Sequence, residues 1–364
     1  MENPFTPMFG MVPPCMAGRS YIISDTLRAL NSENRRPELS TIFIGARGTG
    51  KTALLSYLAQ EARACGWIAV ETISGEGLLE DIYQQTLRQT QHLIEGRSQS
   101  PKLKSLGIPN IVSVEWGTDS PQIGNWRTRM SDMLDALANV EAGLLISVDE
   151  IDDSAEVEQL AAIYQLFVRE NRRVSLIMAG LPFQVSSLLS GKQTSFLRRS
   201  VQHQLGRIAD AEIRDALEAT LEHSEMHIST EALDVLTHAS LGFPFMMQLV
   251  GFRAFDLAQS SKIIDAPTAH RAERLAISDM KTRVLDAALR EMTPTDRKFL
   301  VAMLEDDASS TLEDVAKRMD TSKGNAAKYR KRLLAQGAIE ENLFGGFHFC
   351  LPGLREYLLE IYRR

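Results

Sequence analysis

The chain has 364 residues, a net charge of −7 and 44% hydrophobic residues. That length exceeds one ordinary hydrophobic core and predicts about two or three domains of a soluble globular protein. No apolar run is long enough to span a bilayer, which excludes a membrane-spanning protein, and the acidic balance gives no global sign of nucleic-acid binding. The N-terminus lacks the layout of a signal peptide, and three scattered cysteines fit reduced thiols in a cytoplasmic protein.

Predicted strands and helices alternate in the first half of the chain. Residues 1–17, rich in proline and methionine, are expected to lie as an extended arm on the first domain. Apolar runs predict strands at residues 42–44, 67–73, 143–152, 174–180 and 201–208, and helical periodicity appears at 53–59, 77–95, 126–140 and 155–169. This alternation predicts an α/β fold with a doubly wound parallel sheet. A stretch dense in Gly, Pro and Ser interrupts it at 95–125, where we expect an insertion with a short hairpin.

The second half is predicted to be mainly helical. Helical segments fall at about 210–223, 230–240, 244–260 and 266–288, with no strand signal from 209 to 289. A further set of elements begins at Thr293. We therefore predict an α/β nucleotide-binding domain at 1–208, an all-helical domain at 209–290 and a third domain at 291–364.

The strongest motif is a phosphate-binding loop between the first predicted strand and its helix. Residues 45–52 match G-x-x-x-x-G-K-[ST] in full. The glycines let backbone N–H groups converge on phosphate oxygens, Lys51 reaches the β- and γ-phosphates, and the Thr52 hydroxyl binds Mg²⁺. The motif predicts a site for ATP or ADP with Mg²⁺, formed by Gly45, Ala46, Arg47, Gly48, Thr49, Gly50, Lys51, Thr52 and Ala53.

A second motif closes a buried strand. Asp149 and Glu150 follow the apolar run at 144–148, at the carboxyl end where ligands bind in open α/β sheets. An aspartate there can hold the Mg²⁺, and the adjacent glutamate can orient and deprotonate an attacking water. Two acids that merely solvate a strand end are the alternative.

The chain resembles the AAA+ ATPases over nearly its whole length. The resemblance rests on these two motifs, on Gly18-Arg19 before the first strand, and on the helices that follow the sheet. Within that family the chain resembles the group of archaeal and eukaryotic replication-initiator ATPases. The resemblance implies a base pocket that includes Arg19 and the turn containing Pro244, under a helical lid. A surface arginine and a plain helix start would explain the same residues.

The resemblance also implies groups that complete catalysis, and here the sequence departs from the pattern. The first sensor position, at Ala179 and Gly180, has no polar side chain, and the second would fall near Phe245, which is not basic. Catalysis is then slow, or nucleotide acts mainly as a switch. Arg198 and Arg199 match the place of an arginine finger that reaches a neighbouring subunit, although two solvated surface residues fit equally well.

The C-terminal pattern resembles a winged helix-turn-helix. Helices are predicted at 295–304, 312–319 and 323–336, followed by two strands at 338–341 and 347–351. The helix at 323–336 is basic, and its candidate DNA-binding residues are Lys323, Asn325, Lys328, Tyr329, Arg330 and Arg332. Winged helices also bind proteins, so this alternative stays open.

Two functions follow from these patterns. The first is an ATPase that couples nucleotide state to duplex DNA binding, with a homo-oligomer completing the active site. The second is a regulatory nucleotide switch whose winged helix binds a protein partner. A metabolic kinase is disfavoured because nothing resembles an acceptor-substrate site, and no membrane partner is expected.

Overall fold

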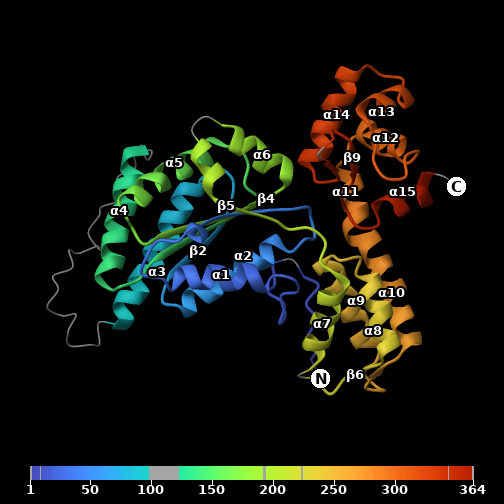
Figure 1. The fold of residues 1–364 in the computed structure, drawn as a ribbon, viewed down its shortest axis with the longest axis horizontal. Helices are drawn as coiled ribbons and strands as arrows, with labels where there is room; N and C mark the ends of the chain where they lie inside the picture. Colours follow the sequence, from blue (N-terminus) through green and yellow to red (C-terminus); the bar gives the residue numbers. More distant parts are fainter. Residues whose placement is uncertain are drawn as a thin grey trace.

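The computed structural model describes residues 2–8, 10–97, 123–191, 194–222, 224–342 and 344–362. The core of the predicted insertion, with its hairpin, lies outside these residues. Figure 1 shows three regions: a sheet covered by helices, a helical region (residues 210–291) and a C-terminal module (residues 294–362). The helical region and the C-terminal module lie at the same end of the sheet, to its right in Figure 1.

The sheet has five parallel strands in the order β2-β3-β4-β1-β5. The strands are β1 (Ser40–Ile44), β2 (Ile68–Ile73), β3 (Leu144–Asp149), β4 (Val174–Gly180) and β5 (Val201–Gln204). All five coincide with predicted strands, and the predicted fold class is confirmed. Because every strand runs in the same direction, the carboxyl ends of β1, β3, β4 and β5 lie at one edge, where ligands bind in such sheets.

Helices cover both faces of this sheet. Ile42 and Ile44 of β1 pack on one face, while Phe43 points to the other, as the alternation of side chains along a strand requires. The helices on the Phe43 face are α1 (Ser20–Leu30) and α2 (Lys51–Ala64). Those on the opposite face are α3 (Leu78–Arg97), α4 (Ile123–Asn139), α5 (Ala155–Arg169) and α6 (Pro182–Ser190). Both faces are therefore apolar, which explains the nearly continuous hydrophobic runs of the strands.

The helical region consists of α7 (Asp210–Leu221), α8 (Thr230–Ala239), α9 (Pro244–Leu257), α10 (Ala266–Met280) and α11 (Asp286–Glu291). The prediction that it contains no strand is wrong in one detail. Two-residue strands, β6 (His227–Ile228) and β7 (Ile263–Ile264), pair in parallel. A pair of this length is too short to produce a periodic sequence signal.

The N-terminal arm packs on α9 rather than on the sheet, so its predicted position is wrong. The side chain of Asn3 donates to the carbonyl oxygen of Phe252 at 3.0 Å, and the backbone N–H of Thr6 donates to Gln248 at 2.8 Å. Phe5, 2% exposed, fills the space above Gly251, where a Cβ would lie 2.4 Å from its ring. Burying one phenylalanine contributes about 1.5–3 kcal/mol, so Phe5 adds substantially to the hydrogen bonds that hold the arm on α9.

The C-terminal module has the predicted order of elements. These are α12 (Pro294–Met303), α13 (Leu312–Arg318), α14 (Lys323–Ala335), the antiparallel pair β8 (Ile339–Glu341) and β9 (Phe347–Phe349), and a final helix α15 (Leu354–Tyr362) that was not predicted. We call the antiparallel pair of β8 and β9 the C-terminal hairpin. The core of the module is continuous with that of the helical region.

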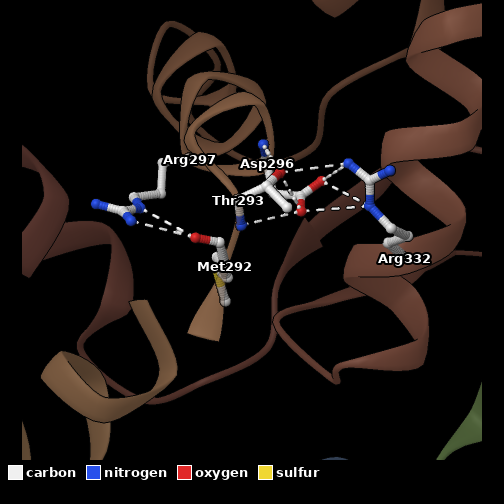
Figure 2. A network of polar contacts seen from close by, with 5 residues as sticks. All are labelled: Met292, Thr293, Asp296, Arg297 and Arg332. Carbon is white, nitrogen blue, oxygen red and sulfur yellow. Dashed lines mark hydrogen bonds and ion pairs between the residues drawn. The ribbon is translucent and has the colours of Figure 1, made fainter. Parts of the chain in front are cut away.

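A buried acid fixes α14 against α12. Asp296, 0% exposed, caps the start of α12 with Thr293 and accepts from the Arg332 guanidinium of α14 at 2.6 Å. Figure 2 shows this network, in which Arg297 also donates to the carbonyl oxygen of Met292. A buried carboxylate needs such partners, because desolvation of an unpaired charge costs several kcal/mol.

Candidate nucleotide-binding site

The loop between β1 and α2 requires its glycines for two different reasons. Gly48 and Gly50 have φ of 81° and 84°, in the left-handed region that residues with a Cβ rarely adopt. A Cβ on Gly45 would lie 2.5 Å from the backbone oxygen of Leu205, so this glycine permits the close approach of the chain after β5. Because α2 begins directly after the loop, its first N–H groups point out of the helix end and favour an anion there.

Lys51 is buried at the start of α2. Its side chain donates hydrogen bonds to the carbonyl oxygens of Gly45 at 2.9 Å and Ala46 at 3.0 Å. Burial lowers the pKa of the ammonium group, an effect that Glu150 and Asp149 partly oppose. The cation is therefore held within the loop, as phosphate binding requires.

The two predicted motifs meet in one hydrogen bond. The Thr52 hydroxyl donates to a carboxylate oxygen of Asp149 at 2.5 Å, although β4 separates β1 from β3 in the sheet. A hydroxyl and a carboxylate side by side are the hard oxygen donors that Mg²⁺ prefers. Within the described residues no three His, Cys, Asp or Glu side chains cluster as a metal site. This pair therefore fits a metal that phosphate oxygens and water also coordinate, not an all-protein cage.

Glu150 lies next to this pair in a strained backbone conformation. Its φ is 52°, and its N–H donates to the Asp149 carboxylate at 2.9 Å. For a residue with a side chain this conformation costs about 1–3 kcal/mol, and such residues cluster at active sites. Its side chain is exposed, so a water molecule can reach the carboxylate.

The residues predicted for the base pocket also lie at the loop. The buried Arg19 donates to the carbonyl oxygens of Thr49 at 3.3 Å and Gly206 at 3.4 Å, and burial lowers its pKa. A Cβ on Gly50 would lie 3.5 Å from Pro244, the first residue of α9. Arg19 thus tethers the loop to the end of β5, and α9 starts against the loop.

The structure gives physical reasons for the two departures from the family pattern. A Cβ on Gly180 would lie 2.9 Å from the Ile151 side chain, so the end of β4 has no room for a polar side chain. Arg253, the basic residue nearest the second sensor position, forms an ion pair with Asp279 at 2.5 Å.

Arg198 and Arg199 are exposed on a short 3-10 helix, Ser195–Arg199, and Arg198 donates to the Leu189 carbonyl oxygen.

A cavity of about 320 Å³ lies beside the loop, within the size range of small-molecule sites. Its wall combines the loop, the chain after β5, Phe243 of the helical region, and the C-terminal hairpin. The wall also contains Arg207 and the hairpin residues Glu340, His348, Phe349 and Cys350, none of which was predicted as a site residue. No local pattern marks the hairpin residues, because only the packing of the C-terminal module against the sheet brings them to the loop.

The candidate DNA-binding residues of α14 differ in their surroundings. Lys323, Asn325 and Lys328 are exposed, with Lys323 paired to Glu313 at 2.8 Å. Three others are engaged within the fold: Arg330 pairs with Glu341, Arg332 with the buried Asp296, and Tyr329 packs under the Arg332 guanidinium. The amino-terminal half of α14 is thus the freer half.

No helix in the described part of the chain has the length and apolarity needed to cross a membrane.

Comparison with known proteins adds two family matches. The AAA domain family matches residues 34–189, and a domain of unknown function (DUF8462) matches residues 282–358. No curated protein matches the sequence.

Three solved structures have a fold similar to that of this chain. Aeropyrum pernix ORC1 in complex with DNA has a TM-score of 0.50 and 14% identity, with 97% of this chain and 95% of that chain covered. A. pernix ORC2, solved as ADPNP-ADP complexes, has a TM-score of 0.50 and 15% identity, with 98% and 97% covered. Pyrobaculum aerophilum Cdc6p has a TM-score of 0.50 and 14% identity, with 98% and 97% covered. Residues 34–189 therefore match the AAA domain family, in a chain whose overall fold is similar to that of these Orc1, ORC2 and Cdc6p structures.

Proposed function

We propose that this protein binds ATP with Mg²⁺ and hydrolyses it slowly. The observation that carries the proposal is the 2.5 Å hydrogen bond between Thr52 and Asp149, which joins the two predicted motifs beside Lys51. In this arrangement backbone N–H groups and Lys51 bind the phosphates, and Thr52 and Asp149 hold the metal. The bound Mg²⁺ supplies charge neutralisation at the β- and γ-phosphates.

Within this proposal Glu150 acts as the group that orients and deprotonates water. Its exposed carboxylate next to Asp149 supports this role, as does its strained backbone. The absence of a polar side chain at Gly180 and the ion pair of Arg253 support slow turnover, because two transition-state contacts of the family are missing. Arg198 or Arg199 from a neighbouring subunit is proposed to supply the missing charge in a homo-oligomer.

Calorimetry with ATP and Mg²⁺, followed by a phosphate-release assay, tests the proposal. We expect binding in the micromolar range typical of nucleotide sites and measurable release of phosphate by the wild-type protein. Absence of heat and of competition with a fluorescent nucleotide would refute the nucleotide site. Binding without hydrolysis would restrict the protein to the switch function.

We further propose that the C-terminal module is a winged helix that binds duplex DNA through the amino-terminal half of α14. The exposed Lys323, Asn325 and Lys328 support this, since basic side chains on an exposed helix bind phosphates in a salt-dependent way. The domain boundaries at residues 208 and 290 and a cytoplasmic location remain part of the proposal. A gel-shift series with duplex DNA at several salt concentrations, with and without ATP, tests it.

A protein partner for the C-terminal module is the second candidate. Arg330 and Arg332 are paired with acids of the module itself, which leaves fewer cations for DNA. Phe344, at the tip of the hairpin, is 96% exposed and would suit an apolar contact. Absence of duplex binding at low salt would favour this function.

A further inference from the structure

The C-terminal hairpin lies across the nucleotide site, although no sequence feature relates the two. Glu340, His348 and Cys350 share one cavity wall with Gly45 and Ala46 of the phosphate-binding loop. Cys350 is 7% exposed and near enough to Lys51 for the two to influence each other's ionisation. The hairpin therefore reaches the part of the loop where the terminal phosphates would bind.

Specific contacts hold the hairpin in this place. The turn that joins α14 to β8 passes the loop so closely that a Cβ on Gly337 would lie 3.2 Å from Leu181 and 3.5 Å from Arg47. One turn earlier in α14, the Lys331 ammonium lies 5.9 Å from the ring centroid of Phe183 in α6. Phe183 packs against the hydrophobic core that includes the C-terminal module. Interfaces between regions of one chain commonly resemble transient protein–protein interfaces and allow relative motion, so a modest free energy can separate the two regions.

The charge on the hairpin opposes an incoming triphosphate. The Glu340 carboxylate lies 4.0 Å from the Cys350 sulfur, and both residues line the cavity together with Arg207 and the loop residues Gly45 and Ala46. Like charges that approach within a few ångströms in a partly buried site repel each other. The repulsion energy is comparable with the free energy by which a few contacts hold the hairpin against the loop. ATP has one more phosphate group than ADP. ATP therefore brings more negative charge near this wall than ADP does.

From these contacts we propose that the C-terminal hairpin is a gate over the nucleotide site, docked without nucleotide or with ADP and displaced by a nucleoside triphosphate. The proposal rests on the nucleotide site proposed above. Displacement frees the whole C-terminal module from α6 and exposes the hairpin for a partner. The nucleotide thereby controls which surface of the module is available.

Alkylation of Cys350 reports the position of the gate. Burial raises the pKa of this thiol to about 12, and a buried, protonated thiol reacts slowly. In the full chain with Cys15→Ser and Cys65→Ser, N-ethylmaleimide labelling is followed by mass spectrometry without nucleotide, with ADP–Mg²⁺ and with a non-hydrolysable ATP analogue. We expect slow labelling in the first two states and an increase of about tenfold or more with the analogue.

Calorimetry on the same samples separates the two proposals. If the analogue binds and the labelling rate does not change, the gate is refuted while the nucleotide site stands. If the analogue does not bind, the nucleotide site is refuted and the gate with it. Fast labelling in the nucleotide-free protein would also refute the gate, because the hairpin would not be docked.

Two variants test the contacts themselves. Lys331→Glu removes the contact with Phe183 at the protein surface and should make labelling of Cys350 fast without nucleotide. The matched control is Lys317→Glu, the same charge reversal at an exposed position of α13, and labelling of Cys350 should stay slow in this variant. Glu340→Gln removes the repulsion and should reduce the acceleration by the analogue at saturating concentration. Equal rates for Lys331→Glu and Lys317→Glu, or full acceleration in Glu340→Gln, would contradict the proposed mechanism.

Discussion

Replacing Lys51 with alanine tests the nucleotide site directly. Lys51 is 6% exposed, and its ammonium group donates two charge-assisted hydrogen bonds to the loop, at 2.9 and 3.0 Å. A hydrogen bond from a charged group contributes about 1.5–3 kcal/mol, and the variant loses both the cation for the phosphates and the support of the loop. We expect a loss of at least about 3 kcal/mol of ATP binding energy, which corresponds to a Kd more than about 100-fold higher.

Isothermal titration calorimetry with ATP and Mg²⁺ measures this change. Arg63→Ala is the matched control, because Arg63 is a cation of the same helix whose partner, Glu71, lies away from the loop. The pH dependence gives a second readout: burial lowers the pKa of Lys51, so the free protein loses this charge at a lower pH than an exposed lysine does. Wild-type affinity should therefore fall as the pH rises from neutral into the alkaline range. An unchanged Kd in Lys51→Ala would refute the assignment of the site.

Three further outcomes follow from the structure. Glu150→Gln should bind ATP with unchanged affinity and reduce phosphate release by about 100-fold or more, since it removes a general base; normal turnover would exclude Glu150 from this role. Asp296→Ala should lower the free energy of unfolding by about 2 kcal/mol, less than the loss of a fully buried pair because its arginine partner is 46% exposed. The matched variant is Asp314→Ala in the first turn of α13, where the exposed carboxylate accepts from the hydroxyl of the N-cap Thr311; it should cost less than about 1 kcal/mol in the same denaturant titration. Lys323→Ala with Lys328→Ala should weaken duplex binding and reduce the salt slope by about two; an unchanged slope would indicate that this half of α14 does not contact phosphates.

The local patterns succeeded where residues near each other in sequence decide the structure. The apolar run of β3 and the eight-residue loop motif each depend on adjacent residues, and both lie where they were predicted. β6 and β7 were missed because two residues cannot show periodicity. The arm was misplaced because its position depends on contacts with α9, among them that of Phe5 with Gly251, that join distant parts of the chain.

The same distinction applies to the candidate site. The types of residue at the loop and at the end of β3 indicated a phosphate and metal site, and the parallel sheet explains why Thr52 and Asp149 meet. The sequence also showed that α14 is basic, but not that Arg332 would be used to neutralise the buried Asp296. Charge alone does not tell whether a cation faces solvent or a carboxylate of the same fold.

The amino-acid sequence by itself determined the class of fold, the phosphate-binding loop and the acids that accompany it, because backbone conformation and strand burial are encoded locally. Only the tertiary structure decided that Glu340, His348 and Cys350 lie beside that loop. Their position depends on how the C-terminal module packs against α6, and packing between distant elements is determined by shape and desolvation that no short stretch of sequence contains.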